Sequence, residues 1–237
     1  MTSSVSSSAN PSSATLGFRL LVFDWDGTVM DSLGSIVACT QKSLADLGLD
    51  RHSDSRIRTV IGLGLRETFE ELFPEIDDAM RQKVVERYRH HWFAGFRDAS
   101  IAIEGAAKTL ERLAEREYWL AVATGKGRPG LERDLDATDM RRFFLATRTA
   151  HDAPSKPNPQ MLLEILDELG VAPQDTLMIG DTTYDLDMAA AAGCASVGVL
   201  TGGHDRSTLL RSGPLTCLES VVELPGWLEK SYPSSQG

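Results

Sequence analysis

Short apolar runs alternate with longer segments of helical periodicity along most of this chain. The runs predict buried strands at Leu20–Phe23, Leu120–Ala123, Leu177–Ile179 and Ser196–Leu200, with a weaker candidate at Phe144–Thr147. Segments 106–114 and 162–169 each have one apolar face, as amphipathic helices do, and Gly170 is a typical C-cap for the second. This alternation predicts an α/β fold with a doubly wound parallel sheet, a Rossmann-like core with helices on both faces.

The alternation is interrupted between residues 31 and 103, where we find helical spacing and no convincing strand. Apolar residues recur there at Leu33, Ile36, Val37, Leu44, Leu47, Leu65, Phe69, Leu72, Met80, Val84, Tyr88 and Trp92. The pattern predicts an α-helical cap domain, 31–103, inserted into an α/β core made of 17–30 and 104–237. Residues 1–16 are a Ser-rich tail whose composition predicts disorder.

The composition narrows the classes of partner. The chain has 237 residues and a formal net charge of −10, and this acidic balance argues against nucleic acid and membrane surfaces as partners. A small anionic substrate remains compatible, because local charges dominate inside a cleft. The N-terminus lacks the basic start and apolar segment of a secretory signal, so we expect a cytoplasmic protein. The oligomeric state does not follow from the sequence.

Four segments place polar residues where carboxyl ends of parallel strands would bring them together. In chain order they contain Asp24, Asp26 and Thr28; Thr124, Gly125 and Lys126; Lys156; and Asp181 and Asp185. Each segment alone also fits an ordinary role, such as a turn after a strand, a solvated loop lysine or a helix N-cap. Their ordered combination favours an enzyme with a shared cleft.

In order and spacing these segments resemble the four motifs of the haloacid dehalogenase superfamily of phosphohydrolases, from about Phe18 to Leu228. The position of the helical insert and the stretch 191–199 resemble the phosphoglycolate phosphatase-like branch. This resemblance implies a doubly wound core, a helical cap and magnesium as the cofactor. It also implies that the main-chain carbonyl of Asp26 binds the metal.

The chemistry of the residues suggests a role for each member of the predicted catalytic set. Asp24 is anionic at neutral pH and would attack phosphorus, which gives an aspartyl-phosphate and splits hydrolysis into two easier steps. Asp26 would protonate the leaving alkoxide and later deprotonate the attacking water. Thr124 and Lys156 would stabilise charge on the phosphoryl oxygens.

The remaining candidates are metal ligands and substrate contacts. Mg²⁺ prefers oxygen ligands, and the predicted metal-binding residues are Asp24, Asp26, Asp181 and Asp185. The predicted substrate-binding residues are Thr28, Gly125, Lys126 and Arg66. The forked donor of Arg66 suits a substrate carboxylate, which would favour a phosphoglycolate-like acid, but an exposed arginine at a helix start fits equally well.

We therefore expect a Mg²⁺-dependent phosphatase that hydrolyses a small phosphorylated metabolite, either a phosphoglycolate-like acid or a sugar phosphate. A sugar phosphomutase of the same fold is the alternative within this class. A regulator that binds a phosphorylated ligand without turnover is the alternative from another class. The resemblance disfavours a dehalogenase, because such enzymes lack an acid at the position of Asp26.

Overall fold

A six-stranded parallel sheet forms the centre of the protein in the computed structural model, which describes residues 17–96 and 101–232. The strand order is β5-β4-β1-β6-β7-β8. The strands are β1 (Leu20–Phe23), β4 (Trp119–Thr124), β5 (Phe144–Thr149), β6 (Thr176–Gly180), β7 (Ala195–Val199) and β8 (Cys217–Leu218). The predicted fold class is confirmed. The predicted tail, 1–16, lies outside the described residues.

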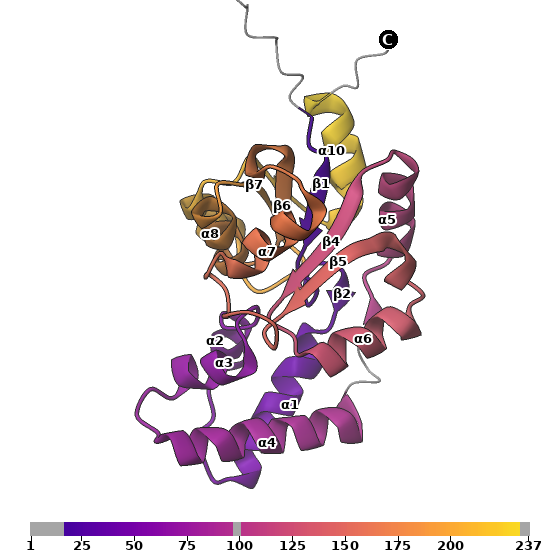
Figure 1. Ribbon diagram of the computed structural model, residues 1–237. Helices are drawn as coiled ribbons and strands as arrows, with labels where there is room; N and C mark the ends of the chain where they lie inside the picture. Colours follow the sequence, from indigo (N-terminus) through magenta and orange to yellow (C-terminus); the bar gives the residue numbers. More distant parts are fainter. Residues whose placement is uncertain (1–16, 97–100, 233–237) are drawn as a thin grey trace, which may run out of the picture.

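The central strand β1 is buried on both faces, because its side chains alternate between two apolar cores. Leu21 and Phe23 pack with residues of α5 (Ala106–Glu115), α6 (Arg128–Ala137) and α10 (Leu224–Ser231). Leu20 and Val22 pack on the other face with α7 (Gln160–Leu169) and α8 (Thr183–Ala191). Figure 1 shows α5 and α10 on one side of the sheet and α7 and α8 on the other. Burial on both faces explains why β1 reads as a continuous apolar run.

A group of four helices between β2 and β3 has an apolar core of its own. The helices are α1 (Leu33–Asp46), α2 (Asp54–Arg58), α3 (Leu65–Leu72) and α4 (Asp78–Ala94), and they lie together at one end of the sheet (Figure 1). Phe69, Trp92 and Leu44 are among the buried residues of this cluster. The predicted domain boundaries at 31 and 103 stay a prediction.

The two connections between this helical group and the sheet pair with each other. Strands β2 (Met30–Asp31) and β3 (Ile101–Ala102) form an antiparallel two-stranded sheet. The expectation of no strand between 31 and 103 is therefore wrong at this point. Strands of two residues are too short to produce an apolar pattern, and the partner here is some seventy residues away. Among the described residues, no helix is both long enough and apolar enough to cross a membrane.

Two neighbouring leucines on α7 give a matched test of the sheet–helix core. Leu162 is fully buried, whereas Leu163 is 42% exposed. We expect Leu162→Ala to lower the free energy of unfolding by about 2–5 kcal/mol, because it leaves a cavity. Leu163→Ala should change it by about 0.5 kcal/mol or less. Urea denaturation of both variants measures the difference, and equal losses would contradict this packing.

Candidate active site

The turn after β1 directs two carboxylates to one side and an indole to the other. Asp24 follows the strand directly, and the carbonyl of Trp25 accepts hydrogen bonds from the amides of residues 28, 29 and 30. Trp25 is fully buried, and its Nε1 donates to Asp134 Oδ2 over 3.1 Å. Asp24 and Asp26 both line a cavity on the opposite side.

Gly27 makes this turn possible, because it adopts a φ of +86° and stands against Asp181. A Cβ atom at Gly27 would lie only 2.6 Å from Asp181 Oδ2. Left-handed backbone of this kind favours glycine, and the close approach excludes a side chain in any case. The turn can therefore bring the first aspartate pair against the end of β6.

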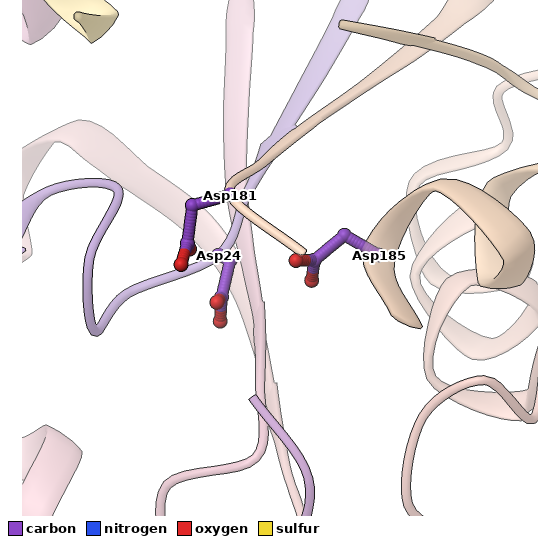
Figure 2. A group of neighbouring side chains, drawn as sticks. All are labelled: Asp24, Asp181 and Asp185. Atoms are coloured by element: carbon purple, nitrogen blue, oxygen red, sulfur yellow. The ribbon is translucent and has the colours of Figure 1, made fainter. Parts of the chain in front are cut away.

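Three buried carboxylates from separate elements converge beyond this turn. Asp24 follows β1, Asp181 follows β6, and Asp185 lies in the first turn of α8. One carboxylate oxygen from each lies within 4.8 Å of the others, and Figure 2 shows the side chains directed toward a common point. Thr28 Oγ1 donates to Asp181 Oδ1 over 2.8 Å, and the amide of Gly203 donates to Oδ2 over 2.8 Å.

Lys156 supplies a positive charge to this cluster from the loop before α7. Its side chain is fully buried, and Nζ lies 2.6 Å from Asp24 Oδ1 and 2.5 Å from Asp185 Oδ1. The other oxygen of Asp185 accepts hydrogen bonds from the amide and hydroxyl of Thr182. One ammonium group thus faces three carboxylates.

Burial and repulsion shift the titration of these groups. Burial raises the pKa of Asp24 well above its usual range; Lys156 opposes this, while Asp185 and Asp181 add to it. Burial, with the charge of Asp185, raises the pKa of Asp181 to about 7. Burial alone would lower the pKa of Lys156, but Asp185 and Asp24 outweigh it and raise the pKa above its usual range. The lysine therefore stays protonated, but its single positive charge does not balance the negative charges of the three carboxylates.

The donor set of the cluster fits a magnesium ion. Both carboxylate oxygens of Asp24 are buried and have no hydrogen-bond partner among the described residues, since the contact with Lys156 is an ion pair without hydrogen-bond geometry. All the side-chain atoms that could bind a metal here are carboxylate oxygens, which suits Mg²⁺. Asp24 is free to bind it directly, whereas the oxygens of Asp181 and Asp185 already accept hydrogen bonds and would share them with the ion. The Asp26 carboxylate is not part of this group, so only its carbonyl stays a predicted ligand.

Asp26 instead belongs to a second charged group that also lines the cavity. Its Oδ1 accepts from Ser32 Oγ over 2.6 Å and from Lys126 Nζ over 2.9 Å. Lys126 Nζ also lies 3.3 Å from Asp134 and 5.0 Å from the centroid of the Trp92 ring on α4. Lys126 was expected to bind phosphate, but in this structure its ammonium holds the proposed acid–base residue. Ser32 and Asp134 were not anticipated, because neither has a distinctive sequence context.

Gly125 and the helical group meet in the lining of the cavity. Thr124 ends β4, lines the cavity with Asp24, and accepts a hydrogen bond from the Lys126 amide over 3.1 Å. A Cβ atom at Gly125 would lie 2.4 Å from the carbonyl oxygens of Gly62 and Leu63, so only glycine permits this contact. The loop between α2 and α3 therefore packs directly on the loop after β4.

Two side chains of the sheet domain also hold this loop, and they were not predicted from the sequence. Tyr184 Oη donates to the carbonyl of Thr59 over 3.2 Å, and His204 Nε2 lies 3.1 Å from the same oxygen. His204 Nδ1 accepts from the amide of Thr183 over 3.0 Å, so Nε2 carries the proton and donates. Because these contacts join distant parts of the chain, no local pattern could have revealed them.

Arg66 borders the same cavity but already has a partner. Its Nη2 donates to Asp78 Oδ1 over 3.0 Å, and its side chain is 58% exposed. This is the arrangement of an exposed arginine at the start of α3. The role of Arg66 toward a substrate carboxylate stays a prediction.

A family model agrees with this geometry. The model of the haloacid dehalogenase-like hydrolases matches residues 21–199, which is more than half of the chain. The chain is a haloacid dehalogenase-like hydrolase. The resemblance stated from the motifs is thereby confirmed, as is the prediction that the chain is an enzyme of this phosphohydrolase family.

Relatives and solved structures cover most of this hydrolase. The "Probable phosphatase IndB" of Dickeya dadantii (strain 3937) is 32% identical over 215 residues, which is 87% of this chain and 92% of the relative. The "Phosphoglycolate phosphatase" of Aquifex aeolicus (strain VF5) is 29% identical, covering 78% of this chain and 85% of its own. A crystal structure of a hydrolase from Pseudomonas syringae has a TM-score of 0.82 at 26% identity, covering 90% of this chain and 99% of its own.

The raised pKa of Asp181 predicts that the hydrolase binds Mg²⁺ more weakly at low pH. The folded pKa of about 7 lies above the ordinary value of 3.8, so below pH 7 the carboxyl must lose a proton to bind metal. We expect the Mg²⁺ affinity to fall at least about tenfold per pH unit below 7, because Asp24, whose pKa is also raised, must lose its proton as well. Calorimetric titration from pH 5.5 to 8.5 measures this, and a flat profile would contradict the assignment.

The same shift fixes the sign of the stability change without metal. Because the Asp181 carboxyl has a higher pKa in the folded protein than in the unfolded chain, its protonation stabilises the folded state. This contribution is fully present below the unfolded pKa of 3.8 and is lost as the pH rises through about 7. The Tm of the metal-free protein should therefore fall between pH 5 and 8, and Mg²⁺ should raise Tm more at pH 8 than at pH 6. Asp181→Asn should weaken both trends.

Lys126 separates two buried carboxylates, so its removal should be costly. We expect Lys126→Met to lower the free energy of unfolding by about 3–5 kcal/mol, because Asp26 and Asp134 would face each other without a counter-charge. Adding Asp134→Asn should recover part of the loss. Lys83→Met, at an exposed site on α4, is the control and should change stability by about 0.5 kcal/mol or less. Equal losses for both lysines in chemical denaturation would rule out this role.

Proposed function

We propose that this hydrolase is a Mg²⁺-dependent phosphatase that cleaves a small phosphate monoester through an aspartyl-phosphate on Asp24. The observation that supports it best is the Asp24 carboxylate, which is buried beside Lys156 and Asp181 and has no hydrogen-bond partner among the described residues. A buried carboxylate in that state is costly unless a cation and a reacting group occupy the site. Relatives that bear the name phosphatase support the reaction class.

In the first step an Asp24 oxygen attacks phosphorus. The new bond joins that oxygen to phosphorus, and the bond from phosphorus to the leaving oxygen breaks. Asp26, two residues further along the turn, gives its proton to the leaving alkoxide. Thr124 and Lys156 bind phosphoryl oxygens as their charge develops. When bound, Mg²⁺ would supply the positive charge that lets an anionic phosphate approach the carboxylates.

In the second step a water molecule attacks the phosphorus of the aspartyl-phosphate. Asp26, now ionised, takes a proton from this water, and the bond between Asp24 and phosphorus breaks. Inorganic phosphate leaves, and Asp24 is a carboxylate again. Ser32 and Lys126 hold the Asp26 carboxylate through both steps. In this proposal Lys126 is a positioning residue, which differs from the phosphate contact expected from the sequence.

The finer assignments belong to the proposal as well. A small phosphorylated metabolite is the proposed partner, and phosphoglycolate-like acids are supported by relatives named phosphoglycolate phosphatase. The cytoplasmic location stays a prediction. A phosphomutase would turn over a sugar phosphate without net phosphate release, and a regulator would bind phosphate without turnover, so one assay separates all three.

Substitution of the two aspartates tests the proposed steps. With Mg²⁺ and p-nitrophenyl phosphate, Asp24→Asn should release no measurable nitrophenol, because no nucleophile remains. Asp26→Asn should release about one equivalent in a burst and then turn over about 10²–10⁴ times more slowly, because this leaving group needs no proton but the attacking water does. Asp187→Asn, an exposed carboxylate on α8, is the control and should behave as wild type.

Several outcomes would count against the proposal. Unchanged turnover in Asp24→Asn would remove the covalent step. Failure of the folded wild-type protein to release phosphate from any monoester would remove the phosphatase, and a test of sugar phosphate isomerisation would then decide for the mutase.

A further inference from the structure

The cavity that begins at Asp24 and Asp26 extends far into the helical group. Its volume is about 510 Å³, and its walls come from the loops after β1 and β4 and from helices α1 to α4. A volume of this order is typical of pockets that enclose a drug-sized ligand. A two-carbon acid phosphate would fill only the part next to the aspartates. The remainder has room for a larger leaving group.

The part of the lining that the helical group contributes is apolar and aromatic. Ile57, Ile61, Val85, Tyr88 and Trp92 all line the cavity and are otherwise buried. The rings of Tyr88 and Trp92 are stacked, with centroids 5.9 Å apart and an angle of 9° between their planes. Such a wall stabilises a ligand that removes apolar surface from water, and planar rings pack well against it.

The charged residues of the lining are poorly placed for a carboxylate on the leaving group. Arg66 is engaged with Asp78 and exposed, and Arg89 is exposed as well. Within the part of the chain that the structure describes, the one buried cation of this lining is Lys126, held between Asp26 and Asp134. A carboxylate deep in the cavity would therefore lie against apolar side chains without a free counter-charge, which is costly.

Tyr88 adds a single polar contact to this wall. Burial raises the pKa of its phenol well above the usual range, with Cys39 and Asp26 adding to the effect, so the hydroxyl keeps its proton. Among the described residues, no hydrogen bond of this hydroxyl is found. It is a donor available to one oxygen or nitrogen on an otherwise apolar ligand.

We propose that the substrate is a phosphomonoester whose leaving group carries a planar, uncharged, aromatic body, which packs against the wall formed by Tyr88, Trp92 and their apolar neighbours. The phosphate lies at Asp24, and the body lies where the cavity continues into the helical group. This inference rests on the proposed phosphatase function and replaces the phosphoglycolate-like acid by another substrate class. It differs from the short acid that the relatives' names suggest.

Three alkyl phosphates distinguish the effect of the leaving group's body from the effect of its chemical reactivity. 2-Phenylethyl phosphate, ethyl phosphate and 2-phosphoglycolate all have primary alkoxide leaving groups, so they differ mainly in the group that would contact the apolar wall. We expect kcat/KM for 2-phenylethyl phosphate to exceed that of each of the other two at least tenfold. A preference for 2-phosphoglycolate, or equal values for all three, would overturn the inference.

Variants of the wall should change the ratio between substrates. Trp92 also faces Lys126, so the readout is the ratio of kcat/KM for 2-phenylethyl phosphate to that for ethyl phosphate. Trp92→Ala should lower this ratio at least fivefold, and Trp92→Phe should restore most of it. His90→Ala, at an exposed position on the same helix and outside the cavity lining, is the control and should leave the ratio unchanged.

A second variant protects the test against loss of folding. Leu65 is half-buried in the lining on α3, and Leu65→Trp would fill the cavity instead of opening the core. It should also lower the ratio at least fivefold, and an unchanged ratio in both Leu65→Trp and a folded Trp92 variant would overturn the inference. If wild type hydrolyses ethyl phosphate and p-nitrophenyl phosphate but shows no aromatic preference, only the substrate class fails. If it hydrolyses none of these esters, the phosphatase proposal fails with it.

Discussion

The repulsion among three buried carboxylates, opposed by the single ammonium group of Lys156, is the constraint on which the site depends. Burying an ion costs several kcal/mol even after relaxation, and an incomplete set of counter-charges leaves much of that cost uncompensated. The raised pKa values of Asp24 and Asp181 are the direct result. A site of this kind favours a divalent cation and an anionic substrate together. The cation supplies the positive charge that the carboxylates lack, and the substrate occupies the space beside the cation.

The cluster follows strands that are buried on both faces of the sheet. Strand β1 lies between β4 and β6, so the residues that follow these three strands meet at one sheet edge. Gly27 and Gly202 leave room for the Asp181 carboxylate, where a Cβ atom would collide with it. The second charged group, Lys126 with Asp26 and Asp134, lies beside the first and touches Trp92 of the helical group. The second charged group and the apolar lining are thus in contact with each other.

The helical group supplies the apolar part of the cavity lining beside this edge. Its loop packs on Gly125 and is hydrogen-bonded to Ser155, Tyr184 and His204, all of which belong to loops or helices of the sheet domain. These contacts fix the apolar wall relative to the aspartates. The carboxylates and the apolar lining therefore come from separate parts of the chain.

Strand–helix alternation was sufficient to predict the sheet and the helical insert, because burial on both faces of a sheet produces apolar runs. The four polar segments predicted which residues meet at the edge of the sheet, because parallel strands align their carboxyl ends. Strands β2 and β3 were not predictable, since two residues form no pattern. Nor were the partners of Asp26: Ser32 is local, but Lys126 and Asp134 lie a hundred residues away. The size and polarity of the cavity were equally hidden. A sequence records which side chains are available, whereas long-range packing decides which of them are paired with each other and which remain free to meet a ligand.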